Sequence, residues 1–219
     1  MKGFLNRRVV NDSDKASKRI QILSIATPLF EKYSYNRISM EQVALKAGIA
    51  KGTLYLYFKT KEELCLAIHS NDYSDWFGEL NQLLISSRKE ISAIQFAKWF
   101  CESLRKRSRF LNTLPIVPII LEQNISLEAA RNYKSLILNH LIENLLLLKE
   151  KLNLTSKDVS KKLFFQIHGI TVGLWSHGFP VKVVEELLKE EEFKDLKVDY
   201  FKVLEETIQQ LIQNSQKKE

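Results

Sequence analysis

One stretch, residues 47–61, constrains the fold more than any other part of the sequence. It reads AGIAKGTLYLYFKTK and holds two glycines close together. Gly48 supplies the permissive backbone that a tight turn between two helices needs. Gly52 leaves the next helix without a side chain near its start, so the backbone there can approach a surface closely. The stretch therefore predicts a helix-turn-helix, whose second helix docks on a partner.

The side chains of the same stretch are suited to binding a polyanion. Cations, hydroxyls and the amides at a helix N-terminus are donors that phosphate oxygens accept from. The stretch offers such donors on both sides of its short helix: Lys51, Thr53, Tyr55, Tyr57, Lys59, Thr60 and Lys61. We interpret it as the half of the motif that enters the major groove of DNA.

The distribution of charge supports this interpretation. The chain has a net charge of +7. Residues 1–61 hold 12 Lys or Arg against 4 Asp or Glu, a balance of +8, which leaves −1 for the remainder. The basic footprint is therefore confined to the segment that holds the motif, as expected for a DNA-reading head on a neutral body. A solvated basic face is the alternative.

An all-α fold is predicted throughout. The chain has only 7 Gly and 4 Pro in 219 residues, so few positions break a helix. Apolar residues at helical spacing predict helices over about 15–33, 40–47, 51–58, 60–86, 91–107, 126–152, 156–177 and 198–213, with a short one within 181–195. Pro28 lies inside the first and predicts a bend near Ser24 or a late re-start. Leu54 and Phe58, four apart, are the expected inward pair of the short helix.

Capping residues mark two helix starts. Ser39 with Gln42 three residues later forms a capping-box pattern, and Thr60 with Glu63 repeats it. Residues 1–14 are expected to form a flexible arm, in which Arg7 and Arg8 touch DNA or which is simply disordered.

Several functional classes are disfavoured. Two cysteines without a metal-binding pattern favour a reducing cytoplasm. The longest apolar run, 114–121, is too short for a bilayer, and the polar, charged composition of residues 1–15 leads us to expect no signal peptide. His168 and His177 lie on opposite faces of one helix, so no metal site is expected. No nucleophile, zinc-protease or phosphate-loop motif indicates an enzyme.

The motif residues also resemble a known family. The run Ala47–Phe58, followed by KEEL at 61–64, is similar to the signature of the TetR/AcrR transcriptional regulators. The resemblance covers about residues 16–68 and includes upstream positions at matching spacing: Ile22, Ala26, Leu29, Phe30, Tyr35, Ser39, Val43 and Ala44.

The resemblance implies which residues meet DNA. Lys51, Gly52 and Thr53 would meet base edges or nearby phosphates. Backbone phosphates would be clamped by Ser39, Tyr55, Tyr57, Thr60 and Lys61. Core packing is the alternative for the two tyrosines. Ala50 departs from the family pattern, because many relatives carry a Ser or Thr there that caps the helix.

The resemblance further implies a DNA-binding domain over 1–61 and a ligand-binding and dimerisation domain over 62–219. It implies no cofactor. It implies instead a repressor that a small-molecule effector releases from its operator. Candidate ligand-binding residues are aromatic or polar: Trp99, Gln123, Tyr133, His140, Phe165, His168 and Trp175. Ordinary core packing is the alternative for each of them. A further alternative is a DNA-binding dimer whose C-terminal domain responds to a protein partner or acts without a ligand.

A homodimer on a palindromic operator is expected, because one helix-turn-helix reads only a few base pairs. Two late helices have broad apolar faces that could form a four-helix interface: Phe164, Ile167, Gly169, Ile170, Gly173 and Leu174 on one, and Phe201, Leu204, Ile208 and Leu211 on the other. Close packing inside one protomer is the alternative.

Overall fold

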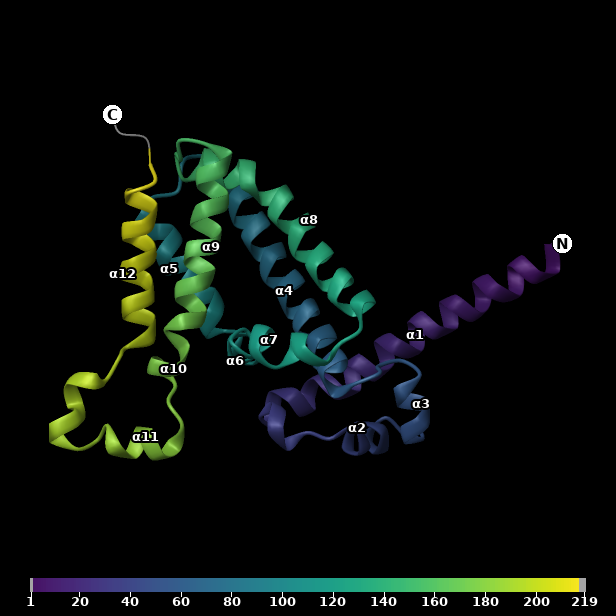
Figure 1. The fold of residues 1–219 in the computed structure, drawn as a ribbon. Helices are drawn as coiled ribbons and strands as arrows, with labels where there is room; N and C mark the ends of the chain where they lie inside the picture. Colours follow the sequence, from purple (N-terminus) through teal and green to yellow (C-terminus); the bar gives the residue numbers. More distant parts are fainter. Residues whose placement is uncertain (1, 217–219) are drawn as a thin grey trace. The chain divides into compact units, whose positions relative to one another are not determined.

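The structure, a computed structural model, describes residues 2–216, with side chains described from residue 14 onward. Within these residues the regular backbone is helical, apart from one isolated bridge between Leu154 and Gln216 (Figure 1). The predicted all-α fold is therefore confirmed. Among the residues described, none of the helices combines the length and the hydrophobicity that a membrane span requires.

The chain divides into two compact units, and each draws on separate parts of the sequence. Unit 1 comprises residues 1–72 and 116–134, and unit 2 comprises 73–115 and 135–219. The sequence placed the boundary at residue 61, whereas the structure divides the chain inside the next helix. It also adds to unit 1 a segment from the middle of the chain.

Unit 1 is built from one long helix and several short ones around the turn. It contains α1 (Lys2–Lys32), η1 (Tyr35–Arg37), α2 (Met40–Lys46), α3 (Lys51–Tyr55) and the start of α4 (Lys61–Ser86). The added segment supplies α7 (Ile116–Ile119), η2 (Leu121–Asn124) and the start of α8 (Leu127–Lys151).

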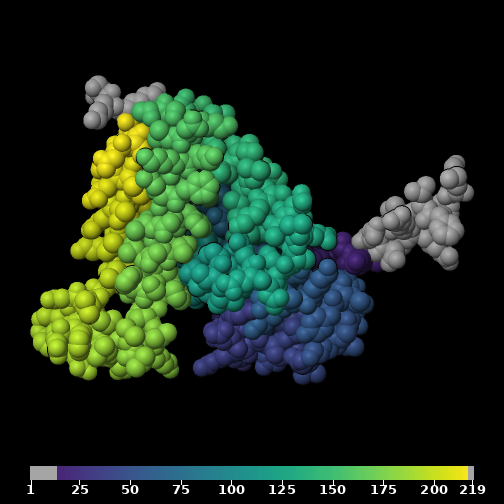
Figure 2. All heavy atoms as spheres, viewed as in Figure 1, coloured from purple at the N-terminus to yellow at the C-terminus, as the bar shows by residue number. Residues whose placement is uncertain are grey.

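Unit 2 contains the rest of α4 and α8 together with the later helices. These are α5 (Ala93–Arg105), α6 (Ser108–Thr113), α9 (Lys157–Gly173), α10 (Trp175–Gly178), α11 (Lys182–Leu187), η3 (Glu191–Leu196) and α12 (Tyr200–Gln213). Residues 179–199, which include α11 and η3, stand out from the rest of this unit (Figures 1 and 2). We call them the arm.

Helix α1 is longer than predicted and is not interrupted at its proline. It continues through Pro28 to Lys32 without the expected re-start. The proline removes a bond to the carbonyl of Ser24, but Ser24 is exposed, so water can satisfy that carbonyl. At the other end the helix begins at Lys2, where an arm was expected. The predicted DNA contacts of Arg7 and Arg8 concern side chains outside the described residues.

The cores of both units follow from apolar periodicity. In unit 1, Leu54 and Phe58 are completely buried, which confirms the inward pair. The added segment contributes Val117, Leu121 and Tyr133, each at most 5% exposed. In unit 2, α12 packs on α5 and α9, and aromatic residues from α4, α5 and α6 form the centre of one cluster.

Candidate functional site

The turn between α2 and α3 has the geometry that its glycine predicts. Gly48 adopts φ = 63°, in the left-handed region that glycine populates without cost. Its amide donates to the carbonyl of Leu45 at 3.1 Å, and the amide of Ile49 donates to that of Ala44 at 3.1 Å. These two bonds form a Schellman motif, which terminates α2 and turns the chain into α3.

Helix α2 begins with the predicted capping box. The Oγ of Ser39 accepts from the amide of Gln42 at 3.2 Å, and Oε1 of Gln42 accepts from the amide of Ser39 at 2.8 Å. Val43 and Ala44 are buried, and Gln42 is exposed. The cap fixes the start of α2, so that the half-buried Ser39 remains at the surface of unit 1.

Helix α3 is shorter than predicted, ending at Tyr55 instead of Phe58. Ala50 provides no side-chain cap, as its methyl group requires. A Cβ added at Gly52 would meet no atom within 4 Å. Packing inside the chain therefore does not require a glycine at this position, whereas close approach of an external surface would.

Lys51 forms an ion pair that the sequence did not predict. Its Nζ lies against Oε1 of Glu41, the second residue of α2, and 5.9 Å from the ring centroid of Tyr55. The hydrogen bond from Lys51, then the amide of Glu41 and Ser39, lower the pKa of the Glu41 carboxyl to about 2. A carboxylate thus stands among three of the predicted DNA-contacting residues.

Thr60 and Lys61, at the start of α4, are both engaged within unit 1. The Oγ1 of Thr60 accepts from the amide of Glu63 at 3.0 Å, which is the predicted cap, and donates to the carbonyl of Asn124 at 2.8 Å. Lys61 donates through Nζ to the carbonyl of Tyr35 at 3.2 Å and lies 3.9 Å from that ring's centroid. Both phosphate-binding candidates therefore already have partners in the protein.

Two carboxylates of α4 bind residues 124–126, which join the end of η2 to α8. The Nδ2 of Asn124 donates to Glu62 at 3.1 Å, and the amide of Ser126 donates to Glu63 at 2.9 Å. The hydroxyl of Tyr35 also donates to Glu62. Burial alone would raise the pKa of Glu62, but the bond from Tyr35, its own amide and Thr60 outweigh burial and lower it. Sequence reasoning missed this cluster, because residues 124–126 are far away in the chain.

The predicted DNA contacts thus all belong to unit 1 but differ in accessibility. Lys51, Gly52 and Tyr55 are exposed, and Tyr55 is 39% exposed. The others are half-buried: Ser39, Thr53, Tyr57, Thr60 and Lys61. The most accessible group therefore lies on α3.

Unit 2 contains an apolar cavity of about 40 Å³. It is lined mainly by aromatic and aliphatic residues of α4, α5, α6, α8 and α9, including Tyr73, Trp76, Phe96, Phe100, Phe110 and Leu163. Three polar side chains of α9 also reach the lining, namely Ser160, His168 and Thr171. Such a lining favours hydrocarbon over charged groups.

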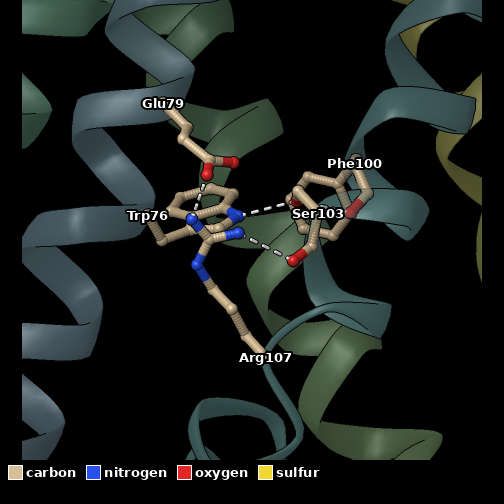
Figure 3. A network of polar contacts seen from close by, with 5 residues as sticks. All are labelled: Trp76, Glu79, Phe100, Ser103 and Arg107. Carbon is tan, nitrogen blue, oxygen red and sulfur yellow. Dashed lines mark hydrogen bonds and ion pairs between the residues drawn. The ribbon is translucent and has the colours of Figure 1, made fainter.

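A polar network holds one wall of the cavity (Figure 3). Nε1 of Trp76 donates to Oγ of Ser103 at 2.9 Å, and that hydroxyl donates to the carbonyl of Phe100 at 2.7 Å. Arg107 donates to the carbonyl of Ser103 at 2.9 Å and pairs with Glu79 at 2.5 Å. The network fixes the indole of Trp76 and satisfies its one polar atom away from the cavity.

The predicted ligand-binding residues are mostly elsewhere. His168 lines the cavity. His140 stacks on Phe77 with centroids 4.8 Å apart, and Trp99 packs 6.2 Å from Trp76. The remaining members lie on the surface, beside the arm or in unit 1: Phe165, which is 53% exposed, Trp175, Gln123 and Tyr133. The cavity residues were missed because apolar periodicity does not distinguish a cavity wall from filled core.

The predicted interface residues divide between core and surface. Leu204 and Ile208 are completely buried and Ile167 is 6% exposed, so they pack inside the protomer, which corrects the sequence-based set. Phe164 lines the cavity. Gly169 and Gly173 are exposed on the outer face of α9, and four members are half-buried: Ile170, Leu174, Phe201 and Leu211.

Comparison with known proteins covers both parts of the chain. Residues 22–68 match the family profile described as bacterial regulatory proteins, tetR family, and residues 70–216 match the tetracyclin repressor-like C-terminal domain. An HTH-type transcriptional regulator of Staphylococcus aureus is 34% identical over 70 residues, which cover 32% of this chain and 38% of that protein. The fatty acid metabolism regulator protein of Bacillus subtilis is 27% identical over 88 residues, covering 39% and 45%. The matched segments thus span less than half of either relative.

Solved structures share the fold. The TetR family repressor AlkX from a Dietzia strain, implicated in biodegradation of n-alkanes, has a TM-score of 0.52 at 20% identity, covering 90% of this chain and 96% of that one. The fatty acid degradation regulator FadR of Bacillus halodurans has a TM-score of 0.54 at 15% identity, covering 90% and 98%. FadR of Bacillus subtilis in complex with stearoyl-CoA has a TM-score of 0.51 at 17% identity, covering 88% and 96%.

Proposed function

This chain belongs to the tetR family of bacterial regulatory proteins, and on that premise we propose that it is a repressor that binds a palindromic operator as a homodimer and is released by a hydrocarbon-bearing effector. The observation that carries DNA binding is the open surface at Gly52, next to exposed Lys51 and Tyr55. The hydroxyl, ammonium and backbone groups there are suited to base edges and phosphates.

Selection from a random duplex library tests the DNA-binding proposal. Recovered sequences should be palindromic, with half-sites spaced by about one helical turn or a multiple of it. Lys51→Ala should change the preferred half-site. Tyr55→Phe should instead weaken binding to all sequences alike, because a phosphate contact carries no sequence information. Recovery of single, unpaired half-sites would contradict the homodimer.

The apolar cavity supports a hydrocarbon-bearing effector. Its volume of about 40 Å³ holds only about three water-sized spheres, so an effector must displace side chains to enter. The shared fold of regulators concerned with fatty acids and n-alkanes suggests a long acyl chain. We therefore propose that a fatty acyl chain inserts beside Trp76 and spreads the helices that line the cavity.

Tryptophan fluorescence measures this insertion directly. Stearoyl-CoA and stearic acid should each change the emission of the wild-type chain and displace it from its selected operator. Trp76→Phe should lose most of the spectral change, whereas Trp175→Phe, whose ring lies outside the cavity lining, should retain it. Operator release without any change in Trp76 emission would place the effector elsewhere. The absence of a response to any apolar ligand would favour a C-terminal domain that responds to a protein partner or acts without a ligand.

A further inference from the structure

The arm, residues 179–199, exposes several apolar side chains and has almost no core of its own. No residue of α11 or η3 is buried. Val181, Val183 and Leu196 are 69%, 75% and 66% exposed, and Leu187 is 42% exposed. Several exposed apolar side chains on one short segment are typical of a contact surface.

The two ends of the arm pack against the rest of unit 2, although most of the residues between them are exposed. A Cβ on Gly178 would lie 2.3 Å from Cβ of Tyr200, so only glycine permits this contact. Tyr200 donates to the carbonyl of Thr171 at 2.9 Å, and its ring lies 5.2 Å from that of Phe179. The two ends of the arm are thus held together at the C-terminal end of α9, and the exposed segment between them is presented as a unit (Figure 2).

The charge of the arm selects the kind of partner. Residues 179–199 contain seven Asp or Glu and four Lys, a balance of −3, which disfavours DNA and anionic lipid. The end of α8 and the first part of α9, residues 149–162, contain five Lys and two Asp or Glu, a balance of +3. Lys157, Lys161 and Lys162 are exposed there. The chain therefore carries a surface complementary to its own arm.

The two surfaces lie at opposite ends of α9, which fits a second copy related by a two-fold axis. Phe165 is 53% exposed on the outer face of α9, with exposed Gly169 and Gly173 one and two turns further on. A two-fold axis at Gly169 would seat Phe165 against the partner's Gly173 and the reverse, because such an interface is self-complementary. It would also bring each arm beside the basic end of the other α9.

We propose that the arm packs across the homodimer on the N-terminal part of the partner's α9. The inference rests on the homodimer in the proposed function and adds the surface by which the two copies recognise each other. Apolar residues of the arm would cover the flank of the opposite helix, and its carboxylates would face the lysines.

Cysteine cross-linking tests the arrangement, since Cys65 and Cys101 are buried and do not compete. Gly169→Cys should form an intermolecular disulfide, because residues on the axis meet their own copies within the ~4.4–6.8 Å between Cα atoms that a disulfide needs. Gly173→Cys is the matched control and should not, because the two copies of that residue lie on opposite sides of the axis.

A second cross-link tests the arm itself. Asp158→Cys and Val181→Cys, prepared separately and mixed, should join through a short bismaleimide only in the mixture. A dimer by light scattering that lacks this cross-link would overturn the arm contact and leave the homodimer standing. A monomer at all concentrations would overturn both.

Discussion

The hydroxyl of Thr60 donates to the carbonyl of Asn124 at 2.8 Å, although the two residues are 64 positions apart. A threonine hydroxyl has one proton to donate. Thr60 can therefore donate a hydrogen bond to a phosphate only after its bond to Asn124 is broken. The bond therefore links the start of α4 to the end of η2 at a residue to which the family resemblance assigns a DNA contact.

We expect Thr60→Ala to destabilise the protein by about 1–2 kcal/mol, because it removes both the cap of α4 and the bond to Asn124. Thr60→Ser keeps a hydroxyl at the same position and should recover most of the loss. Urea unfolding followed by circular dichroism measures both. Equal destabilisation by the two variants would contradict a role for the hydroxyl.

The two glycines of the motif should separate stability from DNA binding. Gly48→Ala forces alanine into φ = 63° and should cost about 1–2 kcal/mol. Gly52→Ala meets no atom within 4 Å and should leave stability unchanged or raise it by up to about 1 kcal/mol, while weakening DNA binding by blocking close approach. Thermal unfolding and fluorescence anisotropy on the selected operator give the two readouts. Normal DNA affinity in the second variant would remove Gly52 from the interface.

Glu41 should act against non-specific binding. Its carboxylate pairs with Lys51 among the DNA-contacting candidates, so Glu41→Gln should strengthen binding to random duplexes several-fold at low salt. Freeing one lysine for a phosphate should also steepen the salt dependence by about 0.9 in log–log slope. Glu206→Gln, at an exposed position of α12, is the control and should change neither. Weaker binding in Glu41→Gln would instead mean that the pair orients Lys51 for DNA.

Glu79 should make unit 2 sensitive to acid. The hydrogen bond from Arg107 holds the pKa of Glu79 below its usual range. A carboxyl whose pKa is lowered by folding stabilises the folded state above its unfolded pKa of about 4.3, and this contribution is lost as the pH falls through the folded pKa. The stability difference between wild type and Glu79→Gln should therefore be constant from pH 6 to 8 and shrink below about pH 4.3. Unfolding curves across this range measure it, and a difference that grows in acid would reverse the assignment.

Local rules predicted the motif well, because each feature depends on neighbours in the sequence. The Gly48 turn, the caps at Ser39 and Thr60 and the inward pair Leu54 and Phe58 were all correctly anticipated. The length of α3 was not, since tertiary packing decides it.

Long-range features could not be read from the sequence in the same way. Many apolar residues share helical spacing, and nothing local distinguishes Trp76 at a cavity from Trp99 beside it. The ion pair of Lys51 with Glu41 and the binding of residues 124–126 by α4 likewise depend on where separate segments meet.

The composition of unit 1 limits how this regulator can be recombined. Residues 116–134 contribute Val117, Leu121 and Tyr133 to its interior, although a long excursion of the chain separates them from the helix-turn-helix. A gene fragment that stops at Asp72 would encode a head with part of its interior missing. Fusing that fragment to a foreign ligand-binding domain should therefore yield a poorly folded hybrid. An exchange of ligand-binding domains among such proteins would have to keep residues 116–134 together with the helix-turn-helix.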